Sequence, residues 1–183
     1  MRARHYTLRG DAYVRQGDLQ AALRDFDEAI RLNRSLESLR HRQSVRLKLK
    51  MYKEAFADAD AAQLLDKGSP SSLNASCWVR AVAGLELKAG LSACDRALKM
   101  RPNNPAFLDS RGLMRLRLGD YEGARTDYTA ALRWWPELAS SRYGLGVALM
   151  RLGRTAEGQQ EIAAAVKMSE SIAADFESFG IKP

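Results

Sequence analysis

One spacing dominates this sequence of 183 residues, because small side chains recur about every 34 positions along most of its length. The clearest column is Ala29, Ala62, Ala97, Ala131 and Ala165, with steps of 33, 35, 34 and 34 residues. Two further columns keep the same period: Gly10, Gln43, Cys77, Gly112 and Gly146, and Ala22, Ala55, Gly90, Ala124 and Gly158. A period of this length is typical of stacked helix–turn–helix units, each of which buries its apolar face against its neighbours.

Alignment of the columns divides the chain into five units within one domain over residues 1–183. The predicted units cover about residues 3–35, 36–69, 70–104, 105–138 and 139–172, and a capping helix is predicted over about 170–180. In the fourth unit Gly119 suits a helix end and Asp120 suits the start of the next helix. Gly17 and Asp18 repeat that arrangement in the first unit.

The fourth and first units resemble the tetratricopeptide repeat family. The matching residues are Gly112, Tyr121, Ala124, Tyr128, Ala131 and Pro136, together with Gly10, Tyr13, Gly17, Ala22, Phe26 and Ala29. Unit two departs from the family pattern at Gln43, Ala59 and Lys67, and unit three carries one extra residue around 84–90. The resemblance implies an all-α fold, a right-handed α-solenoid of about five repeats closed by a C-terminal capping helix.

In this family the first helix of each pair lines a concave groove that receives a partner segment. Transferred by alignment, the expected groove residues are Thr7, Asp11, Arg40, Ser44, Asn74, Trp78, Asp109, Leu113, Tyr143 and Val147. Asp11 and Asp109 would repel a carboxylate, so we do not expect the grip on a C-terminal carboxylate known in the family.

Tryptophan offers the most specific candidate contacts. In the groove Trp78 is expected to anchor a partner through its large area, or else to fill an irregular junction in unit three. Trp134 shares a column with Leu32 and Met100 and is expected in the core. Trp135 falls in a polar column and is expected to be a surface contact.

The charge pattern supports a weaker alternative. The formal net charge is +7, and residues 38–53 carry six basic side chains and no acidic one: Arg40, Arg42, Arg46, Lys48, Lys50 and Lys53. Such a helix would attract nucleic acid or an acidic partner. However, the columns Arg9, Arg42, Arg111 and Asp25, Asp58, Asp127 also suit ion pairs between paired helices.

Nothing in the sequence points to catalysis, so we expect neither an enzyme nor a bound cofactor or metal ion. No glycine-rich phosphate loop, HExxH or GxSxG motif is present. His5 and His41 are the two histidines. Cys77 and Cys94 are interpreted as buried free thiols, with a disulfide left as the alternative. The first residues carry no apolar segment of the signal-peptide type, and a cytoplasmic location is expected.

The sequence therefore predicts a non-catalytic scaffold that binds a peptide or protein segment in its concave groove. A competing hypothesis is a structural subunit that joins copies of itself or a larger assembly through Trp135 or through its first helix, since the sequence shows no capping segment before that helix. Binding of nucleic acid or an acidic partner by the second unit ranks third.

Overall fold

The structure is a computed structural model that describes residues 2–183, and these form eleven α-helices and no strand. The helices are α1 (Arg2–Gln16), α2 (Leu19–Leu32), α3 (Leu36–Lys48), α4 (Tyr52–Leu65), α5 (Pro70–Ala83), α6 (Leu87–Met100), α7 (Pro105–Leu118), α8 (Tyr121–Trp134), α9 (Ala139–Arg151), α10 (Thr155–Met168) and α11 (Ile172–Ser178). Within this part of the chain no helix is long and apolar enough to span a membrane.

The helix ends follow the local sequence. At the start of α8 the Asp120 carboxylate accepts a hydrogen bond from the Gly123 N–H at 3.0 Å, and Asp18 does the same for α2. Such caps satisfy N–H groups that have no partner inside the helix. Gly119 ends α7 with φ +76°, a conformation that costs glycine little. The stops and starts expected at these positions are confirmed.

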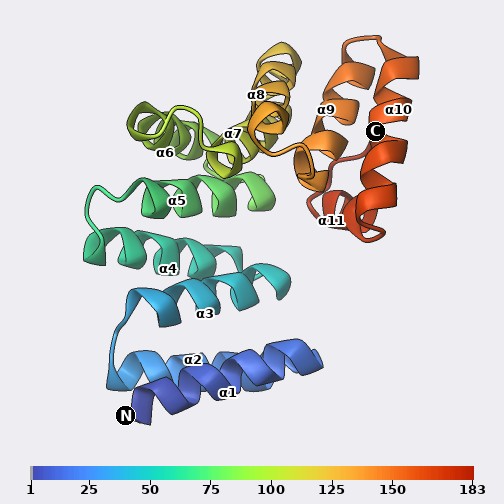
Figure 1. Cartoon of the computed structure of the whole chain (residues 1–183). Coiled ribbons are helices and arrows are strands. Elements are labelled where there is room, and N and C mark those ends of the chain that lie inside the picture. The colour runs from blue at the N-terminus through green and yellow to red at the C-terminus, as the bar shows by residue number, and fades with distance from the viewer. Residues whose placement is uncertain (1) are drawn as a thin grey trace.

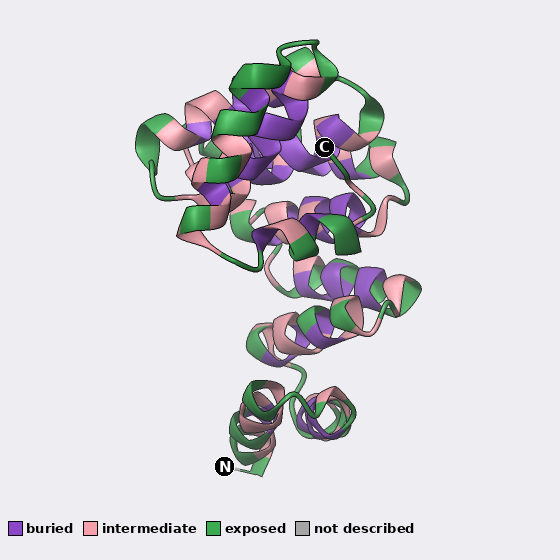
Figure 2. Ribbon diagram, turned by 90° about the vertical axis from the view of Figure 1, so that its right-hand side faces the viewer, coloured by how far each residue is buried: buried purple, intermediate pink, exposed green. Residues whose placement is uncertain are grey.

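Helices α1 to α10 form five antiparallel pairs stacked along one axis (Figure 1). In that view α1 to α5 lie flat, whereas α8 to α10 stand nearly upright, so the stack winds as it rises. The two termini lie at opposite ends of the stack. An all-α solenoid is therefore confirmed, and its buried residues lie in clusters between the helices along the stack (Figure 2).

The small-residue columns form the contacts between paired helices, and all fifteen positions are buried. At Gly112 a Cβ atom would lie 2.7 Å from Cε1 of Tyr128, which is fully buried on the partner helix. Gly10 faces Phe26 in the same way in the first pair. Close packing leaves no room for a larger side chain here, which explains why the columns persist.

Two predictions from the sequence are wrong. The structure joins Cys77 of α5 to Cys94 of α6 as a disulfide, with Cα atoms 5.3 Å apart, so the two are not free thiols. Trp134 is not in the core, because 62% of its surface is exposed. It is the last residue of α8, beyond the contact with the next pair, and Leu32 and Met100 of the same column are exposed for the same reason.

Candidate partner-binding surface

The first helices of successive pairs form the inner layer of the solenoid. Helix α1 contacts α3, α3 contacts α5, α5 contacts α7 and α7 contacts α9, whereas α2, α4, α6, α8 and α10 do not contact one another in residues 2–183. The concave surface is consequently built from α1, α3, α5, α7 and α9. This is the layer on which the groove residues were expected.

The N-terminal half of this surface is open. Ser44 is exposed, and Asp11, Arg40 and Asn74 are partly exposed. Asp11 Oδ1 lies 2.9 Å from His41 Nδ1 on the neighbouring inner helix. Arg40 donates a hydrogen bond to Ser72 Oγ at 3.3 Å. These side chains line a polar surface that crosses the first three repeats.

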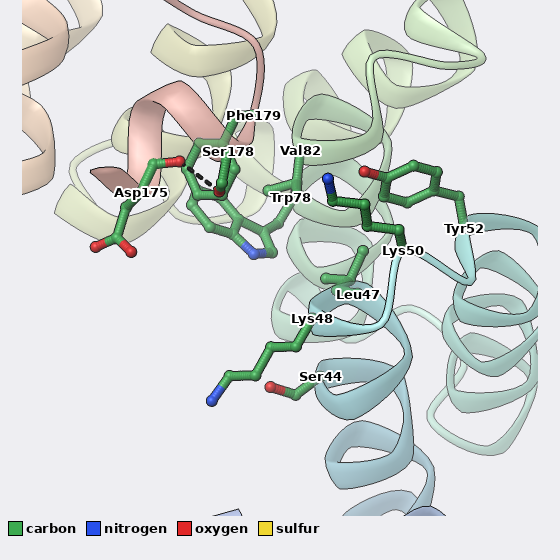
Figure 3. A pocket seen from close by; sticks show the side chains of 10 residues that line it. All are labelled: Ser44, Leu47, Lys48, Lys50, Tyr52, Trp78, Val82, Asp175, Ser178 and Phe179. Carbon is green, nitrogen blue, oxygen red and sulfur yellow. Dashed lines mark hydrogen bonds between the residues drawn. The ribbon is translucent and has the colours of Figure 1, made fainter. Parts of the chain in front are cut away.

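Trp78 lies at the boundary between the open N-terminal half of the concave surface and its C-terminal half. Its partly buried ring borders a cavity of about 270 Å³, with Leu47 and Val82 as further apolar neighbours (Figure 3). The remaining lining residues are Ser44, Lys48, Lys50, Tyr52, Asp175, Ser178 and Phe179. The site therefore combines an apolar floor with lysines on the α3 side and a carboxylate on the α11 side.

The C-terminal half of the concave surface is covered by the chain itself. The Phe176 ring packs on Tyr143 with centroids 4.6 Å apart, and the Phe179 ring meets the Trp78 ring edge to face at 5.9 Å. Arg117 donates hydrogen bonds to the carbonyl oxygens of Ala81 and Val82 at 2.9 and 2.8 Å, and to that of Phe179. The predicted C-terminal capping helix thus lies on the inner layer of the solenoid, where it contacts α9, and it also contacts α10.

Because of this packing, four residues that were predicted to line the groove are buried. Leu113, Tyr143 and Val147 are 2–3% exposed and Asp109 is 8% exposed, so none offers a free surface in this conformation. The cause is the packing of Ile172, Phe176 and Phe179 against the inner helices. Thr7 is buried as well, with its hydroxyl 3.1 Å from Ser38 Oγ between α1 and α3.

A small polar cluster lies beneath α11. Asp109 Oδ1 accepts hydrogen bonds from the hydroxyls of Ser141 and Ser140 at 2.6 and 3.1 Å. Burial raises the pKa of Asp109 to about 6, although these two bonds act in the opposite direction. Burial also raises the pKa of Tyr128, whose hydroxyl has no hydrogen-bond partner among residues 2–183. This lack of a hydrogen-bond partner was not apparent from the sequence, since tyrosine here matches an ordinary core position.

The basic second repeat is largely used in internal ion pairs. Arg42 and Arg46 both reach the buried Asp58 carboxylate at 2.6 Å. The pairs Arg9–Asp25 and Arg111–Asp127 repeat this contact in the first and fourth repeats. The aligned columns therefore form the predicted ion pairs, which leaves Lys48, Lys50 and Lys53 as the exposed cations of the six.

Trp135 and the possibility of a metal site lie outside the concave surface. Trp135 is 49% exposed just after α8, in agreement with the expected partial exposure. Within the described part of the chain no group of three His, Cys, Asp or Glu side chains is placed to hold a metal ion. The concave surface around Trp78 therefore remains the strongest candidate site.

Comparison with known families agrees with this geometry. Two family models, each described as a tetratricopeptide repeat, match residues 6–36 and 110–171. The chain belongs to the tetratricopeptide repeat family. The matched segments contain the first repeat and most of the last two, and they leave out repeats two and three, where the pattern is weakest in the sequence.

Curated relatives of this tetratricopeptide repeat protein include the peptidyl-prolyl cis-trans isomerase FKBP4 of Bos taurus. The two are 28% identical over 112 residues, which is 61% of this chain and 24% of the relative. The human FKBP4 is 29% identical over 104 residues, 56% of this chain and 22% of that protein. The chain thus spans about a quarter of the length of these relatives, and the activity in their name belongs to them.

Solved structures of low identity share the fold. TTC0263, a thermophilic tetratricopeptide repeat protein of Thermus thermophilus, superposes with a TM-score of 0.78 at 19% identity, covering 97% of both chains. MamA from Desulfovibrio magneticus RS-1 gives 0.71 at 18% identity, covering 93% of this chain and 96% of that one. YrrB gives 0.59 at 18% identity, with coverages of 96% and 91%. The tetratricopeptide repeat fold generally serves as a scaffold for protein–protein interaction, and both family models that match this chain are described as tetratricopeptide repeats.

Proposed function

We propose that this chain is a non-catalytic scaffold that binds a segment of a partner protein on its concave surface. The observation that carries the proposal is the cavity beside Trp78, bordered by an apolar floor and by polar groups of the inner helices. A site of this kind anchors a partner through a few buried aromatic contacts. One structural neighbour, YrrB, is described as having an unusual peptide-binding site, which supports the same class of activity.

The proposed contacts in the open half are Asp11, Arg40, Ser44, Asn74 and Trp78. The Asn74 side-chain oxygen is buried and has no hydrogen-bond partner among residues 2–183. That oxygen is enclosed by the protein, whereas the amide NH₂ group of this partly exposed side chain can donate to a carbonyl oxygen of a bound segment. Asn74 is therefore proposed to orient the bound backbone, while Trp78 supplies most of the apolar area.

The competing hypothesis of self-association receives less support. The exposed residues of α1 are mostly polar or basic, with Leu8 as the large apolar exception. Stable interfaces between copies of a chain have an apolar centre. Nucleic-acid binding is also disfavoured, because Arg42 and Arg46 are held by Asp58. The cytoplasmic location expected from the sequence stays a prediction.

The proposal is tested by affinity capture from a lysate of the source cell with two matched variants of the full chain. Ser44→Tyr places a bulky ring on the exposed surface of α3 within the proposed site. Ala57→Tyr places the same ring on the exposed face of the outer helix α4. We expect a protein that is held by the wild type and Ala57→Tyr and lost from Ser44→Tyr, with equal melting temperatures of both variants. Equal capture by both variants would contradict the proposal.

Ser44 is a better test position than Trp78. The Trp78 ring also holds Phe179, so Trp78→Ala would loosen the C-terminal segment in addition to removing a partner contact. Loss of binding in that variant would have two explanations. Ser44 borders the same cavity but makes no side-chain hydrogen bond or ion pair within residues 2–183.

A further inference from the structure

Helix α11 occupies the concave surface in the way a bound peptide would. Its two buried side chains are Ile172 and Phe176, and Phe179 follows one turn later on the same side. These three pack on residues of α5, α7 and α9, which belong to three successive repeats. Within residues 2–183, no outer helix other than α10 contacts α11. The segment is therefore seated in the groove, rather than continuing the alternation of inner and outer helices.

The fit of α11 to the groove is incomplete. A cavity of about 150 Å³ remains beneath it, bordered by Trp78, Leu113, Asp109 and Tyr128 from the solenoid and by Phe176 from α11. The Tyr128 hydroxyl is buried there without a hydrogen-bond partner among residues 2–183. Empty space and an unused hydrogen-bonding group both weaken a contact. A segment that fills the cavity and reaches Tyr128 would bind more tightly than α11 does.

Helix α11 is also short. The helix has seven residues, of which Ala174, Asp175, Glu177 and Ser178 are exposed. Helices of this length do not persist without packing, so α11 loses its helical structure whenever it leaves the groove. The preceding residues Glu170 and Ser171 are exposed and provide a place for the chain to turn away.

The charges around the groove define what can replace α11. Lys48 at the end of α3, Lys50 in the turn that follows and Asp175 of α11 border the same cavity beside Trp78 (Figure 3). Both lysines are exposed, and neither is held by an ion pair within residues 2–183. The α3 side of the groove thus favours acidic groups, and the floor favours aromatic ones.

We propose that the groove of repeats three to five binds a short amphipathic segment of a partner protein, with two aromatic residues three positions apart and acidic residues facing α3. The segment displaces α11, whose Phe176 and Phe179 have the same aromatic spacing and whose Asp175 borders the cavity across from Lys48 and Lys50. The inference rests on the proposed function and adds the type of partner. Asp109, Leu113, Tyr143 and Val147 then become groove contacts only after α11 has left.

The test uses the full chain and a fluorescent peptide with the sequence of residues 170–183. Phe176→Ala with Phe179→Ala removes both ring contacts and frees the groove, whereas Ala174→Ser changes an exposed residue of α11 and serves as the control. We expect the double variant to bind the peptide at least tenfold more tightly than the wild type and the control. A peptide that lacks both phenylalanines should not bind, and one with Asp175→Lys should bind severalfold more weakly.

Equal affinity of the wild type and the double variant for the peptide would overturn the inference. Binding of the peptide without phenylalanines would overturn the aromatic requirement, and unchanged binding of the Asp175→Lys peptide would overturn the acidic one. If the double variant does not fold, hydrogen exchange of residues 172–178 is followed in the wild type with peptide above about 1 mM, the order of the effective concentration of a tethered segment. Faster exchange is expected, and unchanged exchange would overturn the displacement.

Two further outcomes separate this inference from the proposed function. If the peptide fails to bind while Ser44→Tyr still loses its captured protein, the scaffold function stands and the displacement of α11 falls. A dimer of the wild type that dissociates when the peptide is added would assign the groove to a second copy of this chain. That result would overturn the partner segment proposed here.

Discussion

The repeated ion pairs between paired helices allow a prediction with internal controls. Asp127 is 2% exposed and holds two arginines, with Arg111 Nη2 and Arg115 Nη1 each 2.8 Å from its carboxylate oxygens. Asp25 occupies the same position in the first repeat but holds Arg9 alone, at 2.7 Å. The side chains of Arg111 and Arg115 are 20% and 23% exposed, whereas that of Arg9 is 59% exposed.

These differences determine how much unfolding free energy is lost when an Asp→Asn substitution removes each carboxylate charge. Removing one partner of a buried ion pair costs about 3–5 kcal/mol, because the remaining charge stays buried without compensation. Arg111 and Arg115 keep some contact with water as well as their second ion pairs with Asp95 and Asp120, so about 3 kcal/mol, the low end of that range, is expected for Asp127→Asn. Arg9 can return to solvent, and Asp25→Asn should cost about 1 kcal/mol. The difference of about 2 kcal/mol corresponds to about 4–8 °C in melting temperature for a chain of this size.

The measurement is urea unfolding followed by circular dichroism at 222 nm, together with thermal melts of the same samples. Asp58→Asn is the replicate, since Asp58 also holds two arginines with side chains 14–16% exposed. We expect Asp58→Asn and Asp127→Asn to lose similar stability, and Asp25→Asn to lose much less. Equal losses in all three variants would refute the argument that exposure of the remaining arginine decides the cost.

Two other predictions follow from the buried residues. The pKa of Asp109 is raised to about 6 in the folded chain, whereas it is about 4 in the unfolded chain. The contribution of Asp109 to stability is therefore largest below pH 4 and is lost as the pH rises through 6. Asp109→Asn should become more stable relative to the wild type between pH 4 and pH 7, and a constant difference in unfolding free energy over that range would contradict the assigned burial. Gly112→Ala places a Cβ atom 2.7 Å from the Tyr128 ring and should cost about 1–3 kcal/mol in urea unfolding, and an unchanged unfolding free energy would contradict the close packing of this column.

The stacking pattern and the helix ends could be predicted from the sequence because they depend on local chemistry. The period of Ala29, Ala62, Ala97 and their equivalents reports where paired helices touch, and all of these positions are buried. Asp120 and Gly119 act through hydrogen bonds and backbone angles within a few residues. The Arg and Asp columns likewise predicted ion pairs, since residues sixteen apart face each other once two helices fold back on themselves.

The candidate site was predicted less well, because alignment to a repeat assigns a face to each residue but not its neighbours from distant segments. Asp11, Arg40, Ser44 and Asn74 lie on the open inner surface as expected. The apolar spacing of Ile172, Phe176 and Phe179 showed that the tail is an amphipathic helix, but it did not show which surface that helix covers. Trp134 was misplaced because its column lies at helix ends, where burial depends on the winding of the stack.

The sequence alone determined that this chain is a tetratricopeptide repeat solenoid, because its period and small-residue columns are satisfied by stacked helix pairs with local contacts. Only the tertiary structure decided that the C-terminal helix lies in the groove. Its contacts join Phe176 to Tyr143 and Phe179 to Trp78, and the second of these pairs spans more than half of the chain. Contacts of that range depend on the winding of all the repeats between them, which no local pattern encodes.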